Sequence, residues 1–514
     1  MFRFLYKYYR HMKTSKNIKI SLLGLIIFLI GINSESNTIK SQQTITYTLE
    51  EVIKLAQDQS PDALIAKHTF RRSYWGFRSF KAQYLPGIRL NATLPNINRS
   101  INAVQGQDGT SVYTSQSFTD YSVDLSINQK VGLTGGEFFI SSGIRRLDNF
   151  LPDTSTTSYL SNMINIGFSQ PLFQYNAYKW DKIIEPMKYD VARRKYIETN
   201  ETVALTALNH FFTLLLAQVE LEIAKKNESN YDTLFRIAKG RYTLGKIAEN
   251  ELLQLELNLL KAQASVEVSQ LDYENKLFTF KSYLRLKTND EIVLVPPTNI
   301  EHFDVPVQTA IDQAKENTSS GLEFQRRLLD AESNLDQAKK NGRLDADIYA
   351  MFGLTQSSDN IPDSYKNPLD EERVSIGITV PILDWGEAKG RIKMAESSLE
   401  LVQTAVEQEK IDFEQNIFIE VMQFNMQKKQ LYIAAKSDTV AQKRFDVTQK
   451  RYMIGKVNDV LELNNAQIDN DNSKKGYYSS LMNYWQSYYN LRQLTLYDFK
   501  RNTPITFDVD ELLR

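Results

Sequence analysis

The pattern of apolar and polar positions predicts a chain built mainly from very long helices. Apolar residues between 205 and 219 recur at alternating spacings of three and four, which places them along one helix face. The same periodicity extends over 174–239 and 386–449, which correspond to ~99 Å and ~96 Å of helix. Shorter helical stretches are expected at 49–84, 248–287, 308–342 and 459–495.

A second pattern, strict alternation, predicts β-strands between the helices. Apolar side chains occupy every second position in four runs: 88–94, 164–169, 348–354 and 374–380. Period two puts one set of side chains on each face, which suits a soluble sheet packed on the helices or a barrel wall with a watery interior. Aromatic residues gather where strands give way to helices, as at a membrane interface: Phe173, Tyr175, Tyr178, Trp180 and Trp385.

The sequence also contains a tandem repeat. Arg-Tyr-Thr-Leu-Gly-Lys-Ile at 241–247 faces Arg-Tyr-Met-Ile-Gly-Lys-Val at 451–457, an offset of 451 − 241 = 210. Upstream of the strands the offset is 258, so the first copy carries an insertion of 258 − 210 = 48 residues. The repeat defines a first copy, a second copy and a C-terminal tail: 47–295, 300–500 and 501–514.

The insertion lies between Pro86 and Pro171 and has its own alternation. Two short runs at 123–127 and 138–140 are joined through a Gly-rich segment at 132–136, which predicts an extra hairpin near 121–146. The sequence leaves the placement of this hairpin open.

The N-terminus predicts export. Residues 1–19 carry six basic residues and no acid, and an apolar run of 13 residues follows at 20–32. This order is typical of a secretory signal peptide. An inner-membrane anchor is the alternative, but the run is shorter than the ~20 residues that span a bilayer. We expect 1–35 to be the signal peptide.

Composition excludes several classes of protein. The 514 residues include 61 Lys and Arg against 62 Asp and Glu, and this balance argues against a nucleic-acid binder. A mean hydropathy of −0.40 argues against a bundle of membrane helices, although not against a membrane β-barrel. With no Cys, disulfides, thiolate metal sites and lipidation of an N-terminal Cys are excluded.

The segments that resemble catalytic or ligand-binding motifs lack residues that the chemistry requires. Gly240 to Ile247 nearly matches a phosphate-binding loop, but Ile247 occupies the place of the Mg²⁺-binding Ser or Thr, and the segment follows a helix. The four His residues are far apart. We therefore predict that the protein is not an enzyme and has no cofactor and no metal site. A cell-envelope hydrolase is kept as a third hypothesis.

Taken together, these features resemble the TolC-type outer-membrane efflux protein family. The resemblance covers roughly 47–500 and is carried by the repeat, by Gln-Pro-Leu-Phe at 170–173 and Val-Pro-Ile-Leu-Asp-Trp-Gly at 380–386, and by Asp-Val-Leu-Glu at 459–462. The two Arg-Tyr-x-x-Gly-Lys segments and a Thr-Leu-Glu-Glu-Val opening at 48–52 are also typical of the family.

The resemblance implies a mainly α fold with a β-barrel portion. Three chains of four strands each would form one 12-stranded transmembrane barrel, continued by a long periplasmic α-helical barrel. It implies a homotrimer in outer-membrane lipid, a periplasmic adaptor (membrane fusion) protein and an inner-membrane transporter of RND or ABC type. No nucleic acid is implied as a partner.

The resemblance also assigns site residues. Gly245 and Gly455 suit a helix that stops and reverses, since Gly tolerates φ > 0. The tips around them would dock the adaptor, with these candidate residues: Arg241, Tyr242, Gly245, Lys246, Arg451, Tyr452, Gly455 and Lys456. Alternatively, the Arg and Tyr residues only stabilise the turns. Strand-to-helix junctions are expected at Pro171 and Pro381.

Acidic residues near the second tip are the candidate entrance and gating residues. By the resemblance, Asp459 and Glu462 line the narrow periplasmic entrance, and Glu249 is the first-copy equivalent of Asp459. Spacing i, i+3 puts the first two carboxylates on one helix face, and a trimer would assemble them into a ring that disfavours anions. Solvated surface carboxylates are the alternative.

The leading hypothesis is an outer-membrane channel, the passive exit duct of a tripartite efflux pump or of a type I secretion system. It would lie in the cell outer membrane and extend into the periplasm. The alternative is a soluble periplasmic coiled-coil scaffold protein. The sequence does not identify the cargo.

Overall fold

The structure is a computed structural model that describes residues 44–105, 109–150, 154–287, 291–298, 303–456, 460–509 and 512. The predicted signal peptide lies outside these residues. The chain divides into two units, Met1–Tyr47 with Lys287–Val293, and Thr48–Leu286 with Leu294–Arg514. In the small unit, β1 (Thr44–Thr48) pairs with β6 (Glu291–Val295). All that follows concerns the large unit.

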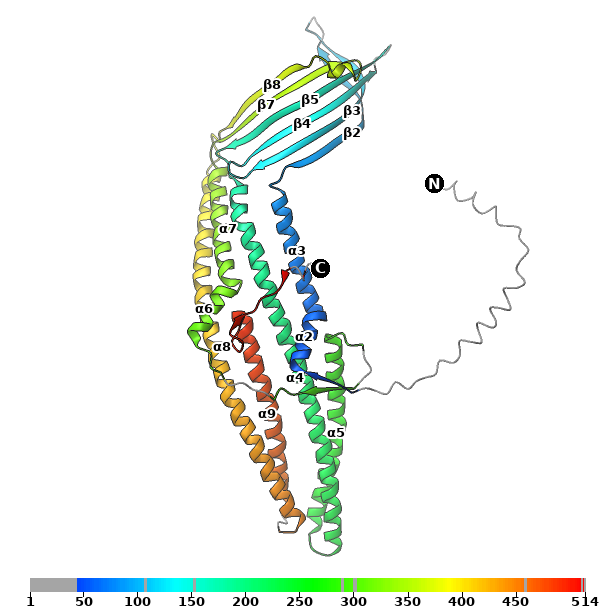
Figure 1. Ribbon diagram of the computed structural model, residues 1–514, viewed down its shortest axis with the longest axis vertical. Coiled ribbons are helices and arrows are strands. Elements are labelled where there is room, and N and C mark those ends of the chain that lie inside the picture. The colour runs from blue at the N-terminus through cyan, green and yellow to red at the C-terminus, as the bar shows by residue number, and fades with distance from the viewer. Residues whose placement is uncertain are drawn as a thin grey trace, which may run out of the picture. The chain divides into compact units, whose positions relative to one another are not determined.

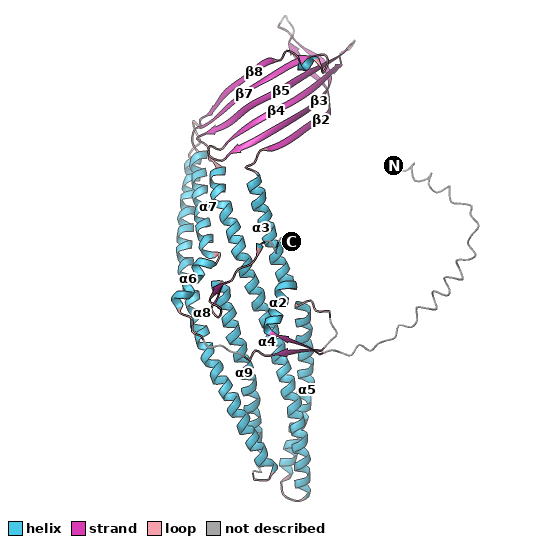
Figure 2. Ribbon diagram, in the orientation of Figure 1, coloured by secondary structure: helices cyan, strands magenta, loops and turns pink. Residues whose placement is uncertain are grey.

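Helices make up most of the large unit. The first group is α2 (Leu49–Gln59), α3 (Pro61–Ala82), α4 (Ala177–Thr243) and α5 (Glu249–Tyr283). The second group has the same order: α6 (Val307–Asn317), α7 (Ser320–Asn341), α8 (Glu387–Met453) and α9 (Val460–Thr495). In the large unit a sheet stands at one end of these helices, and the turns α4–α5 and α8–α9 lie at the other (Figures 1 and 2).

Two stretches predicted as single helices are each divided in two. Ser60 has extended backbone and its Oγ accepts a hydrogen bond from Ala63 N at 3.2 Å, while Pro61 begins α3. Proline cannot donate to the preceding turn, so α2 has to end before it. In the second group, Thr318 is extended and separates α6 from α7.

The helical core is densest along α4. Leu208, Phe212, Leu215 and Val219, which the spacing predicts as one face, are all buried. Among the described helices, α4 alone is long and apolar enough to cross a membrane by length and composition, but 56% of that apolar window is buried in the protein. The window is therefore accounted for by helix packing.

The strands form one antiparallel sheet of six, in the order β2-β3-β4-β5-β7-β8. Their bounds are β2 (Gly87–Gln105), β3 (Ser111–Val131), β4 (Gly136–Phe150), β5 (Ser155–Leu172), β7 (Asp345–Ser358) and β8 (Leu369–Thr379). The remaining elements are short: η1 (Asp363–Tyr365), β9 (Tyr497–Asp498) and β10 (Thr503–Pro504).

The expectation of four strands per chain is therefore wrong. The 48-residue insertion supplies β3 and β4, which pair with β2 on one side and β5 on the other. The predicted hairpin joins the sheet because its strands are long enough to match their neighbours residue by residue: Ile88 lies opposite Ile127, which lies opposite Ile140.

The two faces of this sheet differ in chemistry across all six strands. The register places apolar side chains together on one face: Ile88, Leu90, Leu125, Ile127, Phe138, Ile140, Ile166, Phe168, Ala350, Phe352, Val374 and Ile376. The other face is mostly polar or small at the paired positions: Asn91, Asp124, Ser126, Ser141, Asn165, Gly167, Gly353 and Ser375. It also carries Phe139, Tyr349 and Met351, while the apolar face includes Gln129 and Glu372. On the apolar face, Ile88 is 69% exposed and Ile376 is 64% exposed.

Candidate functional site

The first tip is the turn between α4 and α5. Gly245 has φ = 66°, its N–H donates to Tyr242 O at 2.8 Å, and Lys246 N donates to Arg241 O at 2.9 Å. These bonds satisfy carbonyls at the end of α4 that have no partner within the helix. The helix stops because a side chain at position 245 would be strained in this conformation.

The second tip, between α8 and α9, is built in the same way. Gly455 has φ = 74°, its N–H donates to Tyr452 O at 3.0 Å, and Lys456 N donates to Arg451 O at 3.0 Å. The prediction that the chain reverses at both glycines is confirmed by these angles. Both turns present their Gly and Lys to solvent.

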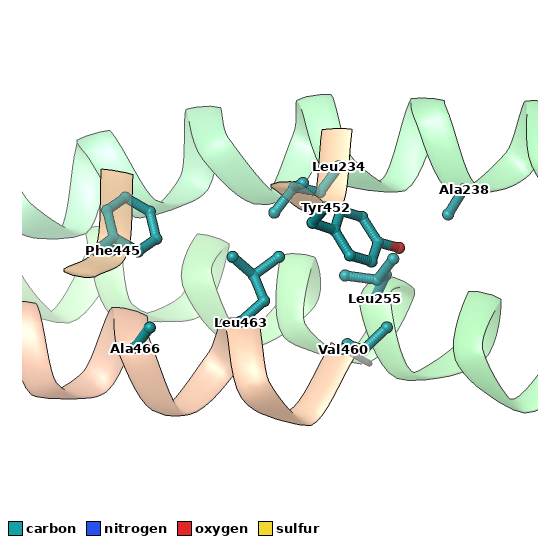
Figure 3. Close-up of a cluster of buried hydrophobic side chains, with 8 residues drawn as sticks. All are labelled: Leu234, Ala238, Leu255, Phe445, Tyr452, Val460, Leu463 and Ala466. Atoms are coloured by element: carbon teal, nitrogen blue, oxygen red, sulfur yellow. The ribbon is translucent and has the colours of Figure 1, made fainter. Parts of the chain in front are cut away.

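A hydrophobic cluster holds the two tips together just behind the turns. Figure 3 shows how side chains from four helices converge there. The buried members are Leu234, Ala238, Leu255, Phe445, Tyr452, Val460, Leu463 and Ala466. Because this cluster joins α4 and α5 to α8 and α9, the tips of one chain form a single packed end.

One polar contact crosses between the tips. Arg241 Nη2 donates to the carbonyl oxygens of Tyr452 and Met453, both at 2.9 Å, so the first tip caps the last turn of α8. The guanidinium also lies 5.2 Å from the centroid of the Tyr452 ring. Tyr452 is fully buried, and burial raises the pKa of its hydroxyl group, which stays neutral.

Arg451 and Tyr242, the repeat equivalents of Arg241 and Tyr452, are in a different environment. Tyr242 is 42% exposed and the Arg451 side chain is 52% exposed. Arg451 Nη1 lies 4.0 Å from Glu462 Oε1. Two of the four predicted Arg and Tyr residues are thus engaged between the tips, and two remain on the surface with Lys246 and Lys456.

The predicted entrance acids are only partly described. Glu249 is the first residue of α5 and is exposed. Glu462 lies in the first turn of α9 with its side chain 42% exposed, facing Arg451. Asp459 lies outside the described residues. No group of three His, Asp or Glu side chains in the described part of the chain is placed to hold a metal ion.

The strand-to-helix junctions lie beside the predicted prolines. Pro171 is the second-last residue of β5 and pairs with Asp347, and Pro381 follows two residues after β8. In each junction an aromatic residue has positive φ, 65° at Phe173 and 52° at Trp385. The Trp385 side chain is 90% exposed.

Sequence reasoning missed two apolar seams on the helix surface. On α8, exposed apolar residues recur every seven positions: Ile419, Met426, Ile433, Val440 and Val447. On α5, another exposed set follows helical spacing: Leu253, Leu257, Leu260, Leu271 and Phe278. The heptad spacing on α8 is visible in the sequence, but spacing alone does not reveal which of several apolar faces the chain itself leaves uncovered.

Comparisons with known proteins agree with this architecture. The profile of the outer membrane efflux protein family matches residues 52–280 and 310–495. The fold is similar to that of the Campylobacter jejuni CmeC outer membrane channel, with 16% identity, a TM-score of 0.63, and 90% of this chain and 88% of that chain covered. No curated protein matches the chain.

Two further solved structures share the fold. The outer membrane protein VceC of Vibrio cholerae is 10% identical, with a TM-score of 0.61 and 89% of this chain and 96% of that chain covered. The open state of the Neisseria gonorrhoeae MtrE outer membrane channel is 13% identical, with a TM-score of 0.56 and 90% of each chain covered.

Proposed function

We propose, from the premise that this chain belongs to the outer membrane efflux protein family, that it is the passive exit duct of a tripartite efflux pump or a type I secretion system. The protein is an outer-membrane channel protein that extends into the periplasm. The main support for an exit duct is the structure of the sheet. It has an exposed apolar face along all six strands and two unpaired edges, β2 and β8.

Open edges are not tolerated in lipid, because unpaired backbone groups there have no water to bond with. β2 runs away from the helices and β8 runs back toward them, so β8 of one copy can pair antiparallel with β2 of the next. Three copies of six strands close a barrel of eighteen strands. Barrel diameter grows roughly linearly with strand number, so this barrel is about 1.5 times as wide as one of twelve.

The repeat supports a specific contact between the helices of neighbouring copies. Adding 210 to the exposed α5 residues Leu253, Leu271 and Phe278 gives Leu463, Leu481 and Tyr488 on α9, which are buried. On α9 this face packs beside α4 within the chain, for example where Gln467 Nε2 donates to Asn227 Oδ1 at 2.7 Å. The α5 seam of one copy is therefore the equivalent surface, and its partner is the α8 seam of the next copy.

The same equivalence extends to the tips. Within a chain, Arg241 of the first tip caps α8 and contacts Tyr452. Between chains, Arg451 of the second tip would cap α4 of the next copy and contact its Tyr242. A closed ring of tips then alternates one contact inside a chain with one between chains, and opening the entrance requires breaking the second kind.

The outer surface of the tips would dock the periplasmic adaptor. Gly245 and Gly455 lie at the extreme ends of the hairpins, where Lys246 and Lys456 are exposed. Asp459 and Glu462, with Glu249, would face the entrance and select against anions. An RND or ABC transporter would supply the energy, since the proposed duct is passive.

The alternative is a soluble periplasmic scaffold, which belongs to a different functional class of protein. It would use the same helices, but it offers no role for an apolar sheet face that is exposed on all six strands. Purified protein inserted into planar bilayers distinguishes the two. The duct gives discrete, reproducible conductance steps, whereas a scaffold gives none and remains in the soluble fraction after lysis.

A further inference from the structure

The extra hairpin creates a mismatch between the sheet and the helices. α3 leads into β2, and α4 follows β5, but β3 and β4 lie between these strands. Three strand spacings are about 14 Å, whereas packed helices lie about 8–10 Å apart. The ends of α3 and α4 that adjoin the sheet are therefore spread (Figure 1).

At the sheet end, the β3–β4 turn fills the space between α3 and α4. A Cβ built on Gly132 would lie 3.4 Å from the Tyr84 ring and 4.0 Å from Tyr178 Cβ, so the turn sits between the two helix ends. Asn176 Nδ2 donates to Gly132 O at 3.2 Å, and Tyr84 Oη donates to Tyr178 O at 3.2 Å. The turn is thus bonded in place.

Below the turn lies a cavity of about 770 Å³. Its walls are largely apolar, with Phe77 and Phe80 from α3 and Ile183 and Pro186 from α4. Farther from the sheet, the same groove is filled by the chain itself, because Phe507 packs edge-on against Phe70 at 5.4 Å between ring centroids. The cavity is the part of the groove that the described chain leaves uncovered.

Three lysines line this apolar space: Lys81, Lys179 and Lys182. Among the described residues, none of their ammonium groups forms an ion pair with a carboxylate. Lys81 Nζ instead lies 4.4 Å from the centroid of the Phe77 ring. Three acids lie nearby: Asp181 and Glu185 on α4, the latter paired with Lys188 at 2.7 Å, and Asp336 on α7, which is paired with Lys340 at 3.0 Å. The balance of charge at the cavity is positive.

The cavity also adjoins the end of the sheet that is nearest the helices. Leu133, which lines it from the β3–β4 turn, is 90% exposed, and nearby Leu85 is 65% exposed. Apolar residues thus continue from the apolar sheet face to the rim of the cavity. A ligand held here would have its apolar part level with the hydrocarbon and its anionic part among the lysines, where basic side chains meet headgroups.

We propose that this cavity binds an acidic phospholipid of the periplasmic leaflet, one molecule per chain. The acyl chains would fill the space between Phe77, Phe80 and Ile183, and the phosphate would lie among Lys81, Lys179 and Lys182. The bound lipid would complete the seal between a wide barrel and a narrower ring of helices. This inference rests on the proposed function, because it requires the sheet to lie in a membrane.

Native mass spectrometry of the delipidated protein in detergent tests the proposal, with phosphatidylglycerol as the probe and phosphatidylcholine as the zwitterionic comparison. We expect one phosphatidylglycerol per chain. The triple variant Lys81→Gln, Lys179→Gln, Lys182→Gln should weaken this binding at least about tenfold, because it removes the positive charges that attract the anionic headgroup. Ile183→Trp should weaken the binding of both lipids, because the larger side chain fills the apolar space.

The matched control is Lys225→Gln with Lys226→Gln and Lys239→Gln, three exposed lysines of α4 far from the sheet. Equal binding of the two lipids, or equal losses in the control and the triple variant, would overturn the proposal. Conductance of the same samples separates this result from the proposed function. Channels that conduct normally without retaining phosphatidylglycerol refute the lipid site alone, whereas absence of conductance in the unmodified protein refutes the duct.

Discussion

At the scale of single residues, identical motifs have acquired different roles. Arg241 and Arg451 occupy equivalent positions of the repeat, yet the first is bonded to the neighbouring tip and the second is half-exposed. The sequence predicts both turns, because glycine at a helix end has few alternatives. It could not predict which Arg is engaged, because that depends on which tip is the neighbour within one chain.

Replacing Arg241 by Ala tests this difference. The variant loses two hydrogen bonds to carbonyls and a cation–π contact, so the end of α8 should fray. We expect hydrogen exchange of the 445–456 segment to increase at least about tenfold, which corresponds to about 1.4 kcal/mol. The measurement is made in the Ile433→Glu background, which we expect to be monomeric in detergent.

Arg451→Ala is the matched control for that experiment. In the monomer it should leave exchange at both tips nearly unchanged, because its ion pair with Glu462 is long and exposed. In the assembled protein it should raise channel open probability. An equal effect of both substitutions in the monomer would contradict the assignment of one contact within the chain and one between chains.

A buried ion pair gives the second prediction at this scale. Arg492 donates from Nε and Nη2 to the two carboxylate oxygens of Glu201, both at 3.0 Å, and the Glu201 side chain is 3% exposed. Arg492→Met leaves this carboxylate without its partner, which should lower the free energy of unfolding by about 3–5 kcal/mol in urea titrations. Arg444→Met breaks an exposed pair with Asp469 and should cost less than about 1 kcal/mol.

The loss in Arg492→Met should depend on pH. Burial raises the pKa of Glu201, and Arg492 opposes that effect in the unmodified protein. In the variant the folded state holds the proton more tightly than the unfolded state does. The destabilisation should therefore be small below the ordinary Glu pKa of 4.5 and grow as pH rises through the raised value. A loss independent of pH would mean that Glu201 finds another cation.

At the scale of elements, periodicity predicts most of the fold. The long helices, the return helices and the runs in β2, β5, β7 and β8 follow directly from spacing. What spacing could not settle is the partner of the inserted hairpin, because pairing of β3 and β4 with β2 and β5 is a property of the sheet and not of the hairpin itself. The division of the predicted 49–84 helix at Pro61 could have been predicted from the sequence, because proline is frequent at the first position of a helix.

The two sheet faces make opposite predictions for adjacent residues of β8. Ile376→Arg places a charge on the proposed lipid face and should reduce outer-membrane insertion, at a cost of at most about 2–4 kcal/mol. Ser375→Arg, on the opposite face, should insert normally and alter ion selectivity. Fractionation of outer membranes measures both, and equal insertion of the two variants would argue for a soluble sheet.

The exposed helix seams predict where copies of the chain meet. Ile433→Glu introduces a charge into the heptad seam of α8, whereas Gln442→Glu introduces one at an exposed position half a turn around the same helix. We expect the first variant to dissociate into monomers in detergent and the second to remain assembled, as followed by size-exclusion chromatography. If both variants remain assembled, the proposed α8–α5 contact loses its support.

At the scale of the whole molecule, the account depends on surfaces that a single chain leaves incomplete. The unpaired edges β2 and β8, the seams of α8 and α5, and the half-exposed Arg451 and Tyr242 all require another copy. The repeat predicts the helical contacts, while the insertion changes the barrel from the twelve strands expected from sequence to the eighteen proposed from the sheet.

The most direct test of this account is the mass of the assembly extracted from outer membranes, measured by light scattering with the detergent contribution subtracted. The account predicts three chains per particle, close to three times the mass of the mature chain. A particle containing one chain, recovered from the soluble fraction, would contradict the shared barrel and with it the proposed duct.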